Sequence, residues 1–451
     1  MKKNGQFFVG TIIVIIVVLY FTVHITYVLR EPTLEKINLM GFYAEEANSL
    51  DAVFIGSSTL RSSINPVELY KDFGITSYVI ATSSQRPSAL LYFLKEAQKL
   101  QKDAVYVLDI NLVRHDLEVW NEQNEGSLRH ITDGMKYSYN RVLCINDIVP
   151  QRKIEYLFDI VKYHDNIKTQ LNWNDWNFER NNPWKGFNML TTAMYLESTY
   201  KNNVCEGGGK DIYSLPEYGE EVLKELLKYC KDEKIKVEFI ITLNPSIDYQ
   251  TCHYIKKVIE LNGFSCFIFN DYQDTMNIDY SSDFYDGLHP NVLGARKCTS
   301  LYGEYLVDKY EFKEKKDNEL IKKWNDDMNF VFAELEEGIE QTEKSAAAKI
   351  GNITADINIY GNNVYFENTT FSLNTLEYAW YVYEELNDGG EQQIDSIWYT
   401  DESCLEYNFE AGKNYRIISF VRVAGNQETA RWETITTLIW DENNNTFILE
   451  R

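Results

Sequence analysis

Two short stretches of the chain carry side chains whose types suit nucleophilic catalysis. DAVFIGSS (residues 51–58) is an apolar run that ends in glycine and two serines. Asp286 and His289 stand three positions apart in YDGLHP, far along the chain. A carboxylate can orient an imidazole, whose other ring nitrogen takes the proton of a serine hydroxyl. The plainer interpretation is that the same residues only cap helices, and the fold decides between the two.

Strands that alternate with helices are expected to position both stretches. Residues 51–110 have a β-α-β pattern, and the alternation resumes over 216–310. This pattern predicts an α/β fold with a parallel sheet and helices on both faces, in a domain of residues 51–310. Open sheets of this kind bind ligands at the carboxyl ends of their strands. Ser58 follows the first predicted strand, and Asp286 and His289 follow the last one.

The alternation fails between about residues 112 and 215, and we interpret this segment as a helical insertion packed on the α/β core. Its tryptophans, Trp173, Trp176 and Trp184, either anchor the insertion to the core or stack on sugar faces.

The C-terminal third of the chain has a different character. Residues 311–345 are rich in charge and predict a helical connector. Residues 346–451 contain short strands with alternating aromatic residues, separated by turn sequences such as NDGG. This spacing predicts an antiparallel β-sandwich that serves as a binding or spacer module.

The N-terminus has the composition of a transmembrane helix. Lys2 and Lys3 precede an apolar run at residues 7–29, which is long enough for a hydrocarbon core that takes about 20 residues. The rival interpretation is a cleaved signal peptide, but its apolar region is normally shorter and ends in small residues. We therefore expect residues 1–29 to be an uncleaved signal-anchor and 30–50 a juxtamembrane linker. The lysines favour a single-pass protein whose remaining domains lie outside the cell membrane.

Charge and cysteine content narrow the classes of partner. The net charge of −24 argues against nucleic acid as a partner. The seven cysteines form no C-x-x-C motif or Cys/His cluster, so we expect no metal and no cofactor.

The two stretches together resemble blocks I and V of the SGNH (GDSL-type) hydrolases. FIGSS matches block I, where Ser58 takes the position of the nucleophile and Ser57 replaces the family's aspartate. YDGLHPNVLGA matches block V, where Asp286 and His289 complete the triad. The resemblance covers residues 51–110 and 216–310 and extends to the membrane-anchored, extracytoplasmic branch. That branch includes teichoic-acid D-alanyl-transfer and polysaccharide O-acetylation proteins, and the C-terminal module resembles Ig-like sandwiches.

Blocks II and III depart from the family pattern. The block II glycine is replaced in ATSSQRPS, where Ser84 would donate its backbone N–H to the oxyanion. The third strand ends in LDIN, so Asn111 matches the block III asparagine. The resemblance thus implies an oxyanion hole formed by the backbone N–H groups of Ser58 and Ser84 and by Asn111.

The resemblance implies an extracytoplasmic serine esterase or O-acyltransferase that acts on acyl esters of a cell-wall or surface polysaccharide. By the same analogy, a membrane-bound O-acyltransferase partner would supply the acyl group. The alternative is a surface glycan-binding or scaffold protein that kept the fold and lost turnover.

Overall fold

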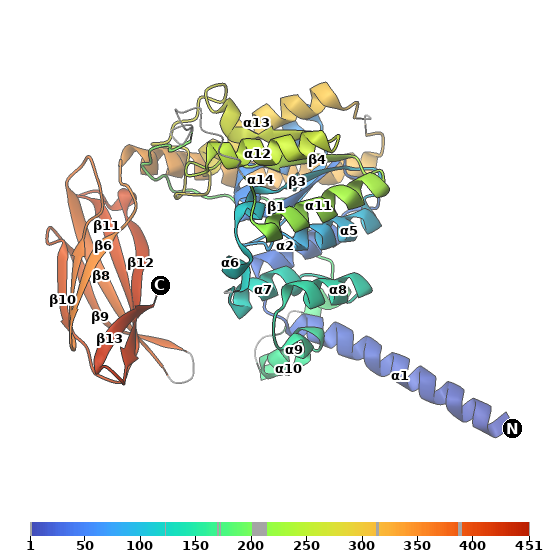
Figure 1. Ribbon diagram of the computed structural model, residues 1–451, viewed down its shortest axis with the longest axis horizontal. Coiled ribbons are helices and arrows are strands. Elements are labelled where there is room, and N and C mark those ends of the chain that lie inside the picture. Colours follow the sequence, from blue (N-terminus) through green and yellow to red (C-terminus); the bar gives the residue numbers. More distant parts are fainter. Residues whose placement is uncertain are drawn as a thin grey trace. The chain divides into compact units, whose positions relative to one another are not determined.

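The computed structural model describes residues 2–121, 123–168, 171, 173–200, 214–312, 315–386 and 390–450. The chain forms two compact units, which we call the α/β unit and the β-sandwich unit (Figure 1). The α/β unit comprises residues 1–189, 199–278 and 288–336. The β-sandwich unit comprises residues 190–198, 279–287 and 337–451.

A five-stranded parallel sheet is the centre of the α/β unit, as the alternation of strands and helices predicts. Its strands are β1 (Ala52–Ser57), β2 (Ser77–Thr82), β3 (Val105–Asp109), β4 (Val237–Ile241) and β5 (Cys266–Ile268). They lie in the order β2-β1-β3-β4-β5, and every neighbouring pair is parallel. All residues of these strands are buried, which explains their near-continuous apolar sequences.

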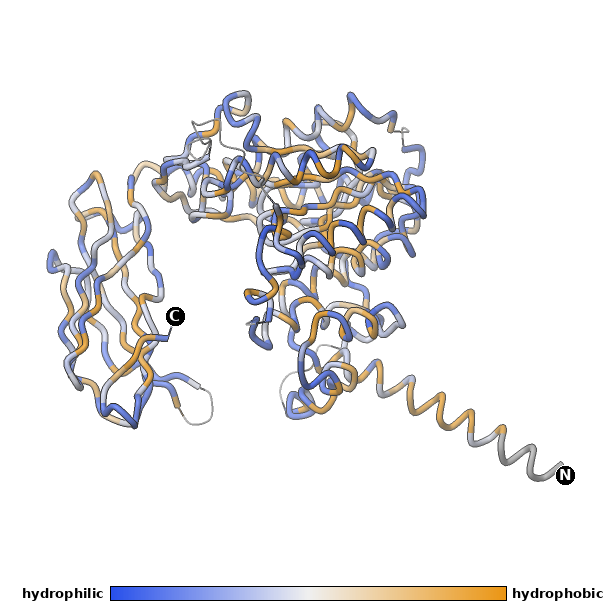
Figure 2. Tube along the Cα trace, viewed as in Figure 1, coloured by the Kyte–Doolittle hydropathy of each residue, from blue (hydrophilic) through white to orange (hydrophobic). Residues whose placement is uncertain are grey.

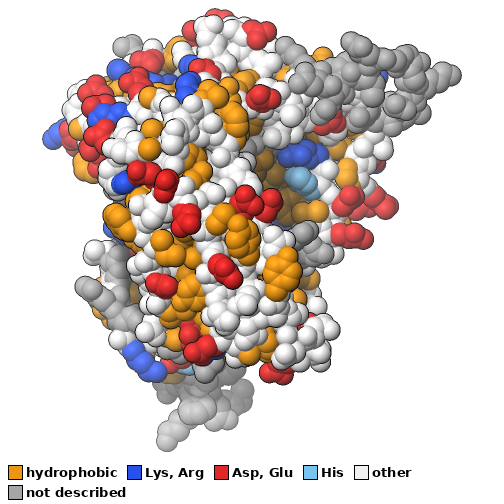
Figure 3. Space-filling model, turned by 90° about the vertical axis from the view of Figure 1, so that its left-hand side faces the viewer, with side chains coloured by type: hydrophobic (Ala, Val, Ile, Leu, Met, Phe, Trp, Pro, Cys, Tyr) orange, Lys and Arg blue, Asp and Glu red, His pale blue; other side chains and the backbone are white. Residues whose placement is uncertain are grey.

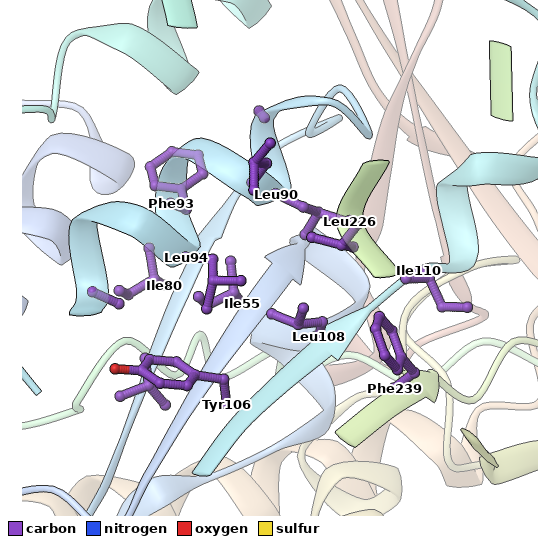
Figure 4. Packing of buried hydrophobic residues seen from close by; sticks show 14 of the residues in the cluster. Ile55, Ile80, Leu90, Phe93, Leu94, Tyr106, Leu108, Ile110, Leu226 and Phe239 are labelled. Atoms are coloured by element: carbon purple, nitrogen blue, oxygen red, sulfur yellow. The ribbon is translucent and has the colours of Figure 1, made fainter. Parts of the chain in front are cut away.

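Helices cover both faces of this sheet. On one face, Leu94 of α5 and Leu226 of α11 pack with Ile55 and Leu108 of the strands (Figure 4). On the other face, Tyr302 of α13 stacks edge-on against Phe54. The helices of this layer structure are α3 (Ser58–Ser63), α4 (Pro66–Phe73), α5 (Ala89–Leu100), α11 (Glu217–Asp232), α12 (Tyr249–Leu261) and α13 (Val292–Lys309).

The strand order places a topological switch point between β1 and β3. Chain connections leave these two central strands toward opposite edges of the sheet, and the crevice at their carboxyl ends is where doubly wound folds bind ligands. Ser58 begins α3 directly after β1, so the predicted nucleophile lies at this crevice.

The segment between β3 and α11 contains short helices. They are η1 (Asn111–Arg114), α6 (Leu117–Asn121), α7 (Glu125–Thr132), α8 (Tyr139–Ile148), α9 (Lys153–Leu157), α10 (Ile160–Tyr163), η2 (His164–Lys168) and η3 (Trp173–Asn177), where η marks a 3-10 helix. The expected insertion is not a single body, because residues 190–198 belong to the β-sandwich unit. There the backbone N–H of Met194 donates to Phe284 (2.8 Å) and that of Tyr195 to Ile350 (3.0 Å).

In the part of the chain that the structure describes, one helix, α1 (Lys2–Leu29) near the N-terminus, is long and apolar enough to cross a membrane. Residues 30–50, which we expected to be a linker, instead contain α2 (Leu34–Tyr43). This helix is part of the α/β unit because Leu39 and Phe42 are buried in its core. The side chain of Thr33 caps α2 by accepting a hydrogen bond from the Lys36 N–H.

The charged connector contains the long helix α14 (Asn318–Ala347), which runs from the α/β unit into the β-sandwich unit. The second unit has a three-stranded antiparallel sheet, β10-β7-β6, and a five-stranded one, β13-β12-β11-β8-β9. The strands are β6 (Ala355–Tyr360), β7 (Asn363–Asn368), β8 (Leu376–Glu385), β9 (Glu391–Thr400), β10 (Cys404–Asn408), β11 (Tyr415–Val423), β12 (Arg431–Asp441) and β13 (Thr446–Glu450), with η5 (Gln427–Thr429) before β12. Phe366 of the smaller sheet and Trp380 and Ile417 of the larger one share the core of this unit.

Candidate active site

The serine and the histidine that the sequence singled out are in hydrogen-bond contact. Ser58 Oγ lies 2.8 Å from His289 Nε2. Both side chains are half-buried, so the pair is screened from bulk water yet open to a substrate. When Nε2 carries no proton, the Ser58 hydroxyl donates to it, which is the arrangement that prepares a serine for attack.

Close packing around Gly56 sets the position of Ser58. A Cβ at residue 56 would come within 2.6 Å of Asp109 Cβ and 2.8 Å of Leu60 Cδ2. Glycine is therefore required here because a side chain would block the close approach of β1 and α3 to β3. The backbone conformation does not require glycine, since the φ of residue 56 is not in the left-handed region.

The start of α13 holds His289 in reach of Ser58. The Asn291 side chain caps α13 by accepting hydrogen bonds from the backbone N–H groups of Leu293 (3.0 Å) and Gly294 (3.3 Å). Further along, the Thr299 hydroxyl accepts from the Asn65 N–H at 3.0 Å, just after α3. The α3 and α13 helices thus form one packed layer that carries the two side chains.

Asp286 belongs to the β-sandwich unit, and its role as the carboxylate partner of His289 stays a prediction. Within that unit, Asp286 lies in a cavity of about 350 Å³ together with Tyr285, Arg431 and Glu433. Burial, and secondarily the charge of Asp286, raise the pKa of Glu433. The two carboxylates therefore share one environment.

The Ser84 backbone has the conformation that a glycine would adopt. Its φ of 47° lies in the left-handed region, which few residues other than glycine enter. Because Thr82 pairs with Ser57 in the parallel sheet, the turn at Ser84 follows the carboxyl end of β2, next to the carboxyl end of β1 where Ser58 lies. Its carbonyl accepts a hydrogen bond from Gln123 Nε2 at 2.6 Å, which holds the turn.

Asn111 follows the carboxyl end of β3, on the same side of the sheet as Ser58. Ile55 pairs with Leu108, and Ser58 and Asn111 each follow three residues beyond that pair. Asn111 is buried, and its Oδ1 accepts a hydrogen bond from Arg114 Nε at 3.1 Å. The contact orients the amide so that the Nδ2 group is the donor that is left for another partner.

A buried polar network next to Ser58 was not predicted from the sequence. The Thr59 hydroxyl lies 2.9 Å from the Ser57 hydroxyl, and Thr242 donates to Thr59 at 3.0 Å. Both threonines reach Asp109 Oδ2 at 3.4 Å. Burial raises the pKa of Asp109 to about 6, although hydrogen bonds from Asn111, Thr242 and Thr59 oppose the shift. The one sequence signal was a charged residue at the end of an otherwise apolar strand.

Glu35 of α2 ties the loop after β2 to α3. Its Oε1 accepts hydrogen bonds from the Ser83 hydroxyl (2.7 Å) and from Arg61 Nη1 (3.0 Å). Burial acts to raise the pKa of Glu35, but the Ser83 hydroxyl and the Arg61 guanidinium outweigh it, so the net pKa is lowered. The ionised carboxylate therefore braces the turn that contains Ser84.

Across the described residues, no group of His, Cys, Asp and Glu side chains has an arrangement that could hold a metal ion.

Figure 3 shows acidic side chains spread over the face in view, in keeping with the net charge of −24. A search with models of known protein families and a search of curated proteins both give no match to this chain.

Proposed function

We propose that the protein is an SGNH-like serine esterase or O-acyltransferase that acts outside the cell. The observation that carries this proposal is the 2.8 Å contact between Ser58 Oγ and His289 Nε2 at the switch point of a doubly wound sheet. A nucleophile and a base within hydrogen-bond reach of each other are the minimum for covalent acyl transfer.

The proposed reaction has two halves. Ser58 Oγ attacks the carbonyl carbon of an acyl ester, and His289 takes the serine proton and returns it to the departing alcohol. Water or a glycan hydroxyl then attacks the acyl-serine, and His289 again moves the proton. Asp286 would orient His289 and stabilise its charged form. The N–H groups of Ser58 and Ser84 and the Nδ2 group of Asn111 would hold the oxyanion.

The proposed location follows from α1. As a membrane anchor with Lys2 and Lys3 on the inner side, α1 would place both units outside the membrane. The substrates there would be acyl esters of a cell-wall or surface polysaccharide. A membrane-bound O-acyltransferase partner would be the source of the acyl group in the transferase version.

An aromatic cavity in the β-sandwich unit favours glycan binding as a second candidate function. The cavity has a volume of about 160 Å³ and is lined by Tyr381, Phe420, Trp398 and Trp432. Trp398 and Trp432 are 63% and 60% exposed, so much of each indole is accessible to a ligand such as a sugar. A protein with this site alone would bind surface glycan without turnover.

Complementation of a gene deletion separates the two functions. We expect deletion to change the acyl content of the surface glycan, a wild-type copy to restore it, and a Ser58→Ala copy to fail. A Ser57→Ala copy is the matched control, because the Ser57 hydroxyl contacts Thr59 and not His289. Restoration by Ser58→Ala would reject the enzyme and leave the glycan-binding protein.

A further inference from the structure

We propose that the α/β unit dips into the outer leaflet of the membrane beside α1. The surface that enters the lipid, which we call the apolar base, consists of Ile154, Phe158, Val161, Ile167 and Trp173. Each of these side chains is between 59% and 68% exposed. The inference rests on α1 as a membrane anchor and is independent of the chemistry at Ser58.

The C-terminal end of α1 is built into the α/β unit and is not a flexible stalk. Residues 26–30 are buried. Arg30 Nε lies 2.7 Å from Asp159 Oδ2, and both side chains are fully buried. The Tyr27 hydroxyl donates to the Gly134 carbonyl at 3.0 Å. The unit and the helix therefore move together, and the helix axis fixes which surface of the unit faces the membrane.

This attachment shortens the part of α1 that is available to lipid. Residues 9–22 are exposed and the next residues become buried. The helix from Phe7 to Thr22 rises about 24 Å, whereas the hydrocarbon core is about 30 Å thick. The missing distance, about 6 Å, matches the depth of about 5–10 Å to which interfacial helices enter a membrane. An apolar surface of the unit around the C-terminal end of α1 would fill this remaining thickness of the hydrocarbon core.

The apolar base lies where α1 leaves the unit. His24 Nδ1 is 2.6 Å from the Trp176 carbonyl oxygen, and the Trp176 ring lies 5.9 Å from Phe21. Trp173 lies 6.2 Å from Trp176, so aromatic rings gather around this turn of α1, as they do at membrane interfaces. Asn166 Nδ2 donates to the Leu29 carbonyl at 2.9 Å, which holds the segment with Ile167 against the helix.

The pictures agree with this placement. The helices α9 and α10 lie beside the C-terminal end of α1, where it joins the α/β unit (Figure 1). The hydrophobic colouring of α1 reaches up to this group of helices (Figure 2). Because the surface continues that of α1, we assign lipid as its occupant.

Depth measurements on the full-length protein in lipid nanodiscs of phosphatidylcholine and phosphatidylglycerol test this inference. A spin label is attached at Phe158→Cys or Val161→Cys, after Cys205 and the half-buried Cys404 have been changed to serine. Collision with oxygen reports lipid, and collision with a water-soluble nickel chelate reports water. Leu261→Cys is the matched control, because Leu261 is also apolar and exposed, at the end of α12. Val14→Cys reports on α1 itself.

We expect the ratio of oxygen to nickel collisions to be several-fold higher at residues 158 and 161 than at residue 261. The inference is overturned if 158 and 161 read as water, like 261, while residue 14 reads as lipid. In that case the apolar base would be a docking site for another protein, and α1 would still be a membrane anchor. A label at residue 14 that reads as water would remove the anchor, and with it this inference, while leaving the proposal for Ser58 untouched.

Discussion

The Ser58 hydroxyl oxygen lies 2.8 Å from the Nε2 atom of His289, although 231 positions separate the two residues in the chain. The doubly wound sheet accounts for this contact. The strand β1 ends at the switch point and releases Ser58 into α3, and α13 packs against α3 with His289 just before its first turn. The sheet and the packed helices α3 and α13 therefore position Ser58 and His289.

Gly56→Ala should disturb both the fold and the site. The new methyl group would meet Asp109 Cβ at 2.6 Å, and overpacking of this kind costs about 1–3 kcal/mol. We expect lower stability in urea denaturation and slower fluorophosphonate labelling. Gly126→Ala is the control, because residue 126 is exposed and a Cβ there would have only Asn124 Oδ1 within 4 Å, at 3.3 Å. Equal stability of the two variants would contradict the packing argument.

The turn at Ser84 should accept glycine and reject proline. Ser84→Gly keeps the backbone N–H and suits the φ of 47°. Ser84→Pro removes that N–H and imposes a φ near −65°. We expect Ser84→Gly to react with a fluorophosphonate as wild type does, and Ser84→Pro to lose 10²-fold or more, about the effect of deleting one oxyanion donor. Normal labelling of a folded Ser84→Pro protein would remove Ser84 from the oxyanion hole.

The raised pKa of Asp109 predicts a pH dependence of stability. Its pKa is about 6 in the folded protein against a usual value of 3.8. Between these values the folded state binds more protons than the unfolded state, so the free energy of unfolding falls as pH rises. The loss from this group is about 3 kcal/mol by pH 7.

Asp109→Asn should remove that loss. The free energy of unfolding of the variant, relative to wild type, should rise by about 2.5 kcal/mol between pH 4 and pH 7. Urea denaturation at several pH values measures the difference, and all other titrating groups cancel in it. A difference that does not change with pH would show that Asp109 titrates normally.

Asp159 should be essential for the attachment of α1. It accepts hydrogen bonds from Arg30 (2.7 Å) and Arg141 (3.1 Å), and all three side chains are buried. Asp159→Ala would leave two buried cations without their partner, at a cost of about 3–5 kcal/mol. Asp165→Ala is the control and should leave stability unchanged, because Asp165 and its partner Lys168 are exposed. Similar thermal stability of both variants would contradict this account.

Features that depend on local pattern were predictable from the sequence. The buried parallel strands have continuous apolar sequences, and Ser58 and His289 follow strand ends that a parallel sheet must bring to one edge. Features that depend on packing between distant segments were not. Asp109 is a site residue only because Thr59 and Thr242 converge on it.

Hydropathy also has a limit at the N-terminus. It cannot separate an apolar residue that faces lipid from one that is buried in protein, so the run at 7–29 was assigned to the membrane as a whole. In the structure its last turn is buried in the α/β unit, and residues 30–50 continue into α2. The helix α2 is short, so its amphipathic pattern was not enough to identify it from the sequence as a helix of the core.

The reaction of the full-length protein with a fluorophosphonate tests the central claim most directly, if both the rate and the site of attachment are measured. We predict that mass spectrometry finds the phosphonyl group on Ser58. We also predict that His289→Gln lowers the second-order rate constant by about 10²–10⁴-fold, the contribution of a general base. Attachment to another residue, or an unchanged rate in a folded His289→Gln protein, would contradict the account.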